Sequence, residues 1–211
     1  MYQTVPHAAS AEFVERRSRF LGYIRPVTTQ EEADAFVDEI RAMHRTATHH
    51  VYAYVLREGQ FQRYSDDGEP QGTAGMPVLN VLLKSGVTDT AVVVVRYFGG
   101  ILLGAGGLVR AYSAGAAAAL REAGIVAMVS CTEVSISCSY SQYGRVSALV
   151  PEYAGVIENT DFSDMVTLQC YLRPEGLPAF QRALADATNG QVKPVLTGER
   201  FVAFPVEAEK I

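Results

Sequence analysis

The chain has 211 residues, of which 48% are hydrophobic and 19% charged, a composition typical of a globular protein with a substantial core. Its net charge of −5 argues against binding of polyanions through overall charge. Residues 1–130 are nevertheless close to neutral, with 12 Lys and Arg against 13 Asp and Glu, and their bases are almost all arginine, the better planar partner for phosphate.

The cysteines and the first residues predict a cytoplasmic protein. Cys131, Cys138 and Cys170 do not form a disulfide framework, and a reducing compartment suits them. Residues 1–10 have neither the basic nor the apolar segment of a signal peptide, and the apolar run 91–95 is too short to cross a bilayer. We therefore expect no signal peptide and no membrane partner.

The first half of the chain predicts alternating strands and helices. Residues 16–27 predict a strand and 28–45 a helix, which Thr28 or Thr29 can cap and whose apolar stripe ends at Met43. A predicted hairpin turns at Glu58-Gly59. The segments that follow are, in order, a hairpin of strands 50–58 and 60–65, a loop at 66–72, a helix at 73–86, a strand at 90–98 buried on both faces, and a helix from about 105 to 122.

The second half predicts the order β-α-β-β-α-β, which is that of a ferredoxin-like domain. Its first strand alternates, with the more apolar Thr132, Val134, Ile136 and Cys138 on the face predicted to pack on two helices. We expect an α+β protein with domains 1–128 and 129–211. The six segments are 130–140, 141–153, 154–163, 164–174, 175–190 and 191–206.

Residues 96–112 hold an unusual glycine run between a strand and a helix. Neither phosphate-loop motif fits, because no Lys-Ser follows Gly104 and Val109 stands where a third dinucleotide-loop glycine belongs. A helix start without β-carbons still favours an anion such as RNA phosphate. The alternative is a tight turn and a small-residue packing face. The candidate anion- or RNA-binding residues are Arg96, Gly99, Gly100, Gly104, Gly106, Gly107 and Arg110.

A second unusual stretch, residues 64–77, carries three acids within four positions. Asp66, Asp67 and Glu69 lack the spacing of a calcium loop, and no nucleophile accompanies them. They either serve turns and an ion pair with Arg96 or Arg110, or form an acid/base set. The adjacent His49 and His50 face opposite sides of a strand, so they cannot chelate one ion together. We predict no metal site, no catalytic set and no cofactor.

Two long motifs, YSDDGEPQGTAGMP and VVVVRYFGGILLGAGGLVRAYS, resemble the signature of the IMPACT family, and RRSRFLGYI and ATHHVYAY resemble its earlier landmarks. The resemblance covers about residues 10–205. It implies a first domain similar to domain 2 of ribosomal protein small-subunit five, with a left-handed β-α-β arrangement, and a second similar to domain V of elongation factor G. It also implies a role around translation, because eukaryotic members restrain a kinase pathway that senses uncharged tRNA.

Two functional hypotheses follow. The first is a non-catalytic protein that binds RNA, the ribosome or a translation factor, with aromatic side chains stacking on bases. The second is an enzyme that acts on a small phosphorylated or carboxylated substrate through the acidic loop and the arginines. The sequence leaves the oligomeric state open. Beyond the anion-binding set, the predicted polar surface comprises His49, Asp66, Asp67, Glu69, Thr73, Tyr97 and Tyr112.

Overall fold

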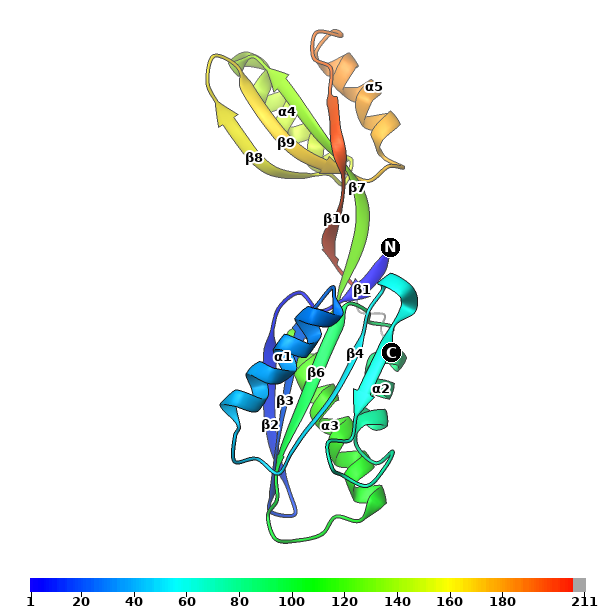
Figure 1. The fold of residues 1–211 in the computed structure, drawn as a ribbon. Helices are drawn as coiled ribbons and strands as arrows, with labels where there is room; N and C mark the ends of the chain where they lie inside the picture. The colour runs from blue at the N-terminus through cyan, green and yellow to red at the C-terminus, as the bar shows by residue number, and fades with distance from the viewer. Residues whose placement is uncertain (207–211) are drawn as a thin grey trace. The chain divides into compact units, whose positions relative to one another are not determined.

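The structure is a computed structural model that describes residues 1–206. The chain divides into two compact units, one built mainly from Tyr2–Ala127 and the other from Met128–Phe204 (Figure 1). Each unit combines helices with an antiparallel sheet. The predicted α+β class with two domains is confirmed. No helix within residues 1–206 is both long enough and apolar enough to cross a membrane.

The N-terminal unit is built on an antiparallel sheet with the strand order β2-β3-β6-β4-β5. The predicted burial of the central strand on both faces is correct, since Val92–Val95 are completely buried in β6. The uninterrupted β-branched run suits a strand covered on both sides. The strands are β2 (Ala9–Glu15), β3 (Ser18–Pro26), β4 (His49–Val55), β5 (Gln62–Ser65) and β6 (Thr90–Tyr97).

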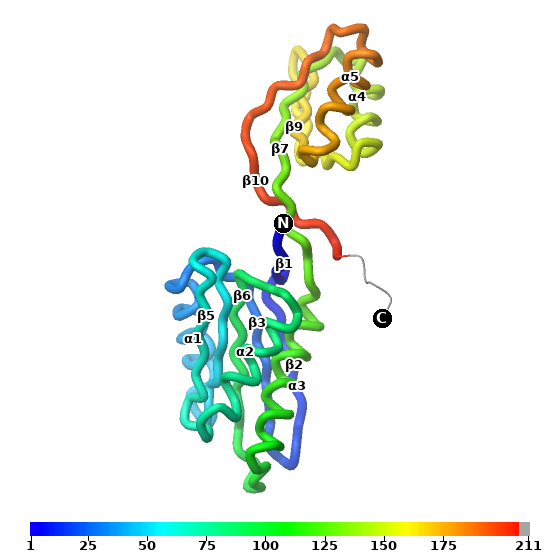
Figure 2. Tube along the Cα trace, turned by 90° about the vertical axis from the view of Figure 1, so that its right-hand side faces the viewer, coloured from blue at the N-terminus to red at the C-terminus, as the bar shows by residue number. Residues whose placement is uncertain are grey.

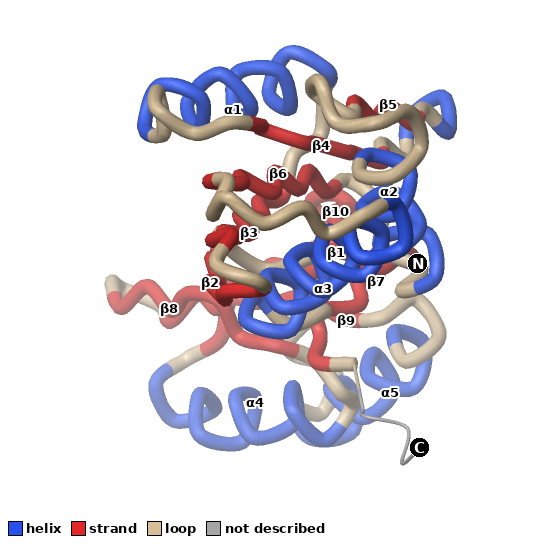
Figure 3. Tube along the Cα trace, turned by 90° about the horizontal axis from the view of Figure 1, so that it is seen from below, coloured by secondary structure: helices blue, strands red, loops and turns tan. Residues whose placement is uncertain are grey.

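Helices cover both faces of this sheet. Helix α1 (Gln30–Met43) lies on one face, and α2 (Gly75–Lys84) and α3 (Ala105–Ala123) lie on the other (Figure 3). Thr29 and Glu32 form a capping box at the start of α1. The predicted stripe of α1 is buried from Ala33 to Ile40, whereas Met43, in its last turn, is 56% exposed.

Helix α3 approaches β3 closely through two glycines. A β-carbon on Gly22 would lie 2.3 Å from the backbone oxygen of Gly115, and one on Gly115 would lie 2.9 Å from Val94. Real side chains do not make contacts this short, so the helix and the sheet require glycine at both positions. The predicted small-residue face is therefore correct at Gly115.

Two strands precede the first predicted one. Strand β1 (Tyr2–Thr4) bridges to Val87, and β2 pairs with β3 over its whole length. The sequence of β2, ASAEFVE, is poor in β-branched residues, so its propensity does not distinguish it from a loop. The predicted turn at Glu58-Gly59 contains a short 3₁₀ segment, Glu58–Gln60.

The C-terminal unit follows the predicted β-α-β-β-α-β order. Its sheet has the strand order β1-β7-β9-β8, and β10 also pairs with β7. Helices α4 and α5 lie side by side over one face of the sheet (Figure 2). The elements are β7 (Val126–Cys138), α4 (Tyr140–Glu152), β8 (Val156–Phe162), β9 (Val166–Leu172), α5 (Leu177–Ala187) and β10 (Val195–Pro205).

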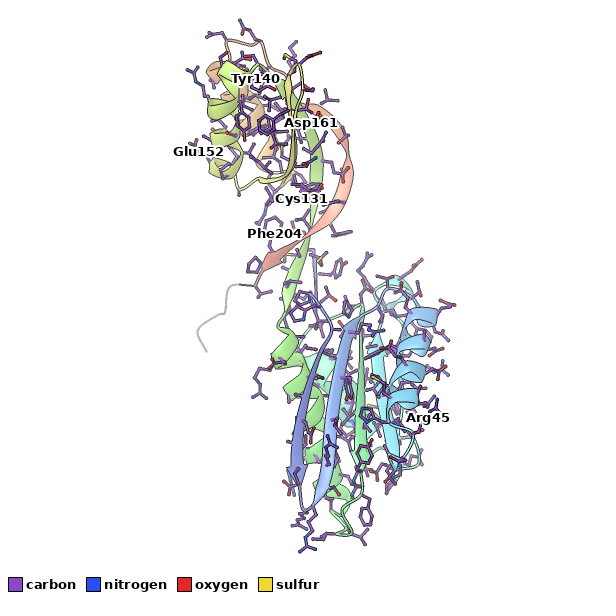
Figure 4. All side chains as sticks on the ribbon, turned by 90° about the vertical axis from the view of Figure 1, so that its left-hand side faces the viewer. Arg45, Cys131, Tyr140, Glu152, Asp161 and Phe204 are labelled. Carbon is purple, nitrogen blue, oxygen red and sulfur yellow. The ribbon has the colours of Figure 1, made fainter. Side chains whose placement is uncertain are left out.

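The alternation of β7 sorts its side chains as predicted. Val134, Ile136 and Cys138 are completely buried in the core that includes α4 and α5. On the opposite face Ser137 contacts the hydroxyl of Thr167 at 3.1 Å. Cys131 lies lower on β7, and Tyr140 begins α4 (Figure 4). All three cysteines are free and buried, and burial raises the pKa of each thiol, that of Cys170 to about 11.

Candidate binding site

The acidic loop is held by backbone contacts within the N-terminal unit. The Asp66 carboxylate accepts N–H bonds from Gly72, Ala74 and Gly75 at 2.8–3.1 Å, so it caps the start of α2. The Thr73 hydroxyl donates to the Pro70 carbonyl at 2.6 Å. Asp66 and Thr73 are thus occupied in shaping the loop.

Asp67 connects the same loop to strand β4. Its backbone has a positive φ of 43°, and its carboxylate accepts the His50 N–H at 2.6 Å. The Arg41 guanidinium lies 3.5 Å from the other carboxylate oxygen. The Asp67 carbonyl accepts a bond of 2.7 Å from Nδ1 of His49. A carbonyl only accepts, so Nδ1 carries the proton and Nε2 of a neutral His49 has a free lone pair.

Glu69 joins the acidic loop to the glycine segment through a buried polar network. Its Oε1 accepts from Nη1 of Arg96 at 2.6 Å and from the Tyr112 hydroxyl at 2.7 Å. The Arg96 and Glu69 side chains are only 5% and 4% exposed. His49 Nε2 lies 3.7 Å from the same oxygen, and Nη2 of Arg96 donates to Ser18. The predicted contact between an acid of the loop and one of the two arginines is present.

Burial of this network changes the role of two predicted residues. The Glu69 carboxylate neutralises the Arg96 guanidinium, so little of its positive charge is left to attract an external anion. Tyr112 is completely buried and packs edge-on against Phe20. Burial and the Glu69 carboxylate both raise the pKa of its phenol. The expectation that Tyr112 stacks on bases does not fit this position.

The glycine segment serves both packing and helix initiation. A β-carbon on Gly99 would lie 2.0 Å from the Arg17 backbone, Gly100 has a φ of 82°, and Gly107 packs on Leu103. Gly104, with a φ of 71°, precedes α3. A β-carbon added to Gly106 would meet only the Arg110 guanidinium, at 3.9 Å. The packing interpretation is therefore correct at Gly99 and Gly107, whereas anion binding at the start of α3 stays a prediction.

Arg110 does not share the position of Arg96. It lines a cavity of about 230 Å³ together with Gly107, Glu15 and Arg16. The idea that both arginines point at one place is therefore wrong, because one turn of α3 directs Arg110 toward the β2–β3 turn. Tyr97 also lies elsewhere, since its hydroxyl bonds to Nδ1 of His44 at 2.8 Å.

Sequence reasoning missed the two arginines of the β2–β3 turn. Arg16 and Arg17 form the two-residue loop of a hairpin, both with positive φ, of 45° and 66°. Within residues 1–206, neither they nor Arg110 has an ion-pair partner. The two adjacent arginines could have pointed to this basic site. The turn itself was not recognisable, because it contains no Gly, Asn or Asp. We call Arg16, Arg17 and Arg110 the arginine tip.

Sequence reasoning also missed a larger cavity over the buried network. Its volume is about 400 Å³, and Thr48, His49, Glu69 and Arg96 contribute to its lining. The rest of the lining comes from Pro70, Phe98, Leu102, Leu103, Gly104, Ala105 and Leu108. Leu102 is 81% exposed and Phe98 46%. We call this the apolar pocket.

Comparison with known proteins places the chain among relatives. A family model described as the Impact N-terminal domain matches residues 16–120, and a domain of unknown function (DUF1949) matches residues 136–191. IMPACT family member YvyE of Bacillus subtilis is 38% identical over 191 residues, which cover 90% of this chain and 88% of that protein. The chain belongs to the IMPACT family.

Two further comparisons cover a similar share of the chain. IMPACT family member YigZ of Escherichia coli is 40% identical over 88% of this chain and 94% of its own. A solved structure described as the crystal structure of an hypothetical protein is 36% identical, with a TM-score of 0.59, and covers 99% of this chain and 98% of that one. The resemblance of the sequence motifs to this family is thereby confirmed over most of the chain.

Proposed function

We propose that this IMPACT family protein is a non-catalytic binding protein that contacts RNA, including RNA of the ribosome, in the regulation of translation. The observation that carries the proposal is the arginine tip, three arginines without ion-pair partners within residues 1–206. Exposed arginines beside a glycine-rich helix start match phosphate, and they act locally even on an acidic protein. The role in translation that the family resemblance implies also supports RNA binding.

The carboxylates of the acidic loop favour binding over catalysis. Asp66 accepts three backbone bonds, Asp67 accepts one from His50, and Glu69 holds Arg96 and Tyr112. A general base must reach a substrate proton, and groups already holding structural partners suit that task poorly. These hydrogen bonds instead hold the loop rigid, which suits a scaffold that presents the arginine tip.

Removing the charges of the arginine tip is expected to weaken RNA binding by about tenfold or more. The variant combines Arg16→Asn, Arg17→Asn and Arg110→Gln, since asparagine tolerates the positive φ of the turn. Filter binding to a structured RNA and to ribosomes, from 50 to 400 mM salt, measures the effect. The log–log salt slope should fall by about one for each phosphate that the variant no longer neutralises.

A matched control removes three charges elsewhere in the same unit. Arg45, Lys84 and Arg121 are exposed and lack ion pairs within residues 1–206, and Arg45 stands beyond the end of α1 (Figure 4). Their replacement by glutamine should leave the affinity within about twofold of the wild type. Equal losses in both triple variants would indicate a general charge effect and contradict the assignment. No binding at 50 mM salt would exclude RNA and direct the search to a protein partner.

Replacing Gly106 with valine should abolish RNA binding while the protein stays folded. Gly106 lies in the first turn of α3, and its missing β-carbon leaves open space where a backbone phosphate can approach. Circular dichroism checks the fold, and the same filter assay checks binding. Loss of structure in this variant would instead assign Gly106 to packing.

A further inference from the structure

The cavity of about 230 Å³ at the arginine tip lies between strand β2 and helix α3. Its polar lining consists of Glu15, Arg16 and Arg110, and all three side chains are exposed and can contact a ligand from solution. The volume lies just below the range of sites for drug-sized ligands, about 300–1,000 Å³, which suits a single flat ring system. We call this the tip cavity.

The apolar wall of the tip cavity suits an aromatic ring. Phe13 stacks on Phe20 with the ring centres 5.2 Å apart and an angle of 10° between the planes, which fixes its orientation. On the side of α3 the wall is formed by Gly107, Ala111 and Ala114, whose short side chains leave room beside the helix. Nucleobases stack on aromatic side chains whatever their sequence, so this wall suits an unpaired base.

Glu15 brings an unpaired carboxylate to the same cavity. The alternation of β2 places Glu15 on the same strand face as Phe13, next to α3. Within residues 1–206 its carboxylate has neither a hydrogen bond nor an ion pair. A carboxylate only accepts hydrogen bonds and repels phosphate, so the group that enters the cavity carries N–H donors. The exocyclic amino groups of cytosine, adenine and guanine are such donors, whereas uracil has an acceptor oxygen where cytosine has its amino group.

The two arginines of the cavity can bind the backbone on either side of such a base. Neither Arg16 nor Arg110 has an ion pair in the part of the chain that the structure describes. The positive φ of Arg16, 45°, costs free energy for a residue other than glycine, and such strain is concentrated at functional sites. A nucleotide whose base enters the cavity keeps its phosphates outside, where guanidinium groups can bind them. A duplex keeps its bases paired and out of the cavity.

We infer that the tip cavity takes one unpaired RNA base with an exocyclic amino group, which donates to Glu15 while Arg16 and Arg110 bind the neighbouring phosphates. No covalent bond is made or broken. The inference rests on the proposed RNA binding and deepens it, because it names single-stranded RNA as the form that is bound and adds a preference among bases. That preference depends on Glu15, which is not part of the arginine tip.

The test compares two RNA hexamers that differ only at the edge of the base. Fluorescence anisotropy at about 50 mM salt, where phosphate contacts are strong, measures the affinity of the full chain for labelled hexacytidylate and hexauridylate. The two carry the same phosphates, so the arginines act equally on both. We expect hexacytidylate to bind at least about fivefold more tightly, as for a hydrogen bond to a charged group. Equal affinities would overturn the assignment of the base and leave RNA binding in place.

A third RNA distinguishes failure of this inference from failure of the proposed function. The structured RNA used to test the arginine tip is titrated in parallel. If it binds and neither hexamer does, the tip cavity does not take a base, and the inference alone is overturned. If none of the three binds, the proposed RNA binding is overturned together with the inference.

Glu15→Gln tests the contact with the amino group. An amide both donates and accepts, so this variant should reduce the preference for hexacytidylate to within about twofold. Its matched control is Glu122→Gln, because Glu122 is an exposed carboxylate of the same unit that has no ion pair within residues 1–206 and does not line the cavity. The control should keep the full preference. An unchanged preference in Glu15→Gln, or an equal loss in both variants, would contradict the role of Glu15.

Ala114→Leu tests whether the base enters the cavity. Ala114 is exposed, so the larger side chain fills the cavity without disturbing the core. We expect hexacytidylate to bind about fivefold more weakly or worse, because stacking and the hydrogen bond to Glu15 are both lost. Ala42→Leu is the matched control, an exposed alanine of α1 outside the cavity, and circular dichroism checks both folds. Equal affinities of these two variants for hexacytidylate would place the base elsewhere and overturn the inference.

Discussion

Replacing Glu69 with alanine is expected to lower the free energy of unfolding of the N-terminal unit by about 3–5 kcal/mol. The change leaves the Arg96 guanidinium buried without its counterion and removes the acceptor of the Tyr112 hydroxyl. Breaking one side of a buried pair costs more than the pair itself contributes, because the remaining charge stays desolvated. Native-state hydrogen exchange of the amides of β3 and β6 reports on this unit separately.

A double variant tests whether the loss of stability comes from the unpaired Arg96 charge or from a general loss of packing. Glu69→Leu together with Arg96→Met replaces both charges by apolar groups of similar size. Buried ion pairs replaced in this way are often neutral in stability, so the double variant should be clearly more stable than Glu69→Ala. If the two proteins are destabilised equally, the cost lies in packing and the electrostatic account is wrong.

Replacing Gly22 with alanine is expected to cost about 3 kcal/mol or more, at the upper end for overpacking. The added methyl group would lie 2.3 Å from the Gly115 carbonyl oxygen, and 3.2 Å from the Ala119 methyl group. The nearest atom belongs to the backbone of α3, so the whole helix must move away from the sheet. The same hydrogen-exchange measurement detects the loss.

Gly106→Ala is the matched control for this substitution. Gly106 lies in α3, the helix that the Gly22→Ala substitution would displace. A β-carbon at Gly106 meets only the end of a flexible arginine side chain, at 3.9 Å. Alanine in a helix is as stable as glycine or more so, by up to about 1 kcal/mol. A comparable loss in both variants would show that the short contact at Gly22 is not the cause.

Patterns that depend on neighbouring residues were readable from the sequence. The capping box at Thr29, the alternation of β7 and the start of α3 after Gly104 each rest on local chemistry. The meeting of the acidic loop with Arg96 could also be anticipated, because isolated charges near a buried strand need partners.

The helical spacing of α3 predicts which of its side chains are buried, but our sequence prediction did not use it. Leu108, Tyr112, Ala116 and Ala119 recur at helical spacing, which assigns Tyr112 to the buried face. Arg110 falls outside that stripe and is exposed. The conformation of residues 98–103, which form much of the apolar pocket, depends instead on contacts with distant segments such as the Arg17 backbone. Sequence spacing carries no information on such contacts.

The two-residue turn at Arg16-Arg17 bears on how this protein responds to stabilisation. Tight hairpin turns with two positive φ angles favour Asn-Gly, whereas arginine carries a conformational penalty there. Selection for thermal resistance alone would therefore replace these residues early. A thermostable derivative obtained in that way would lack the charges of the arginine tip. If the proposed RNA binding holds, its melting temperature would rise while its affinity for RNA fell.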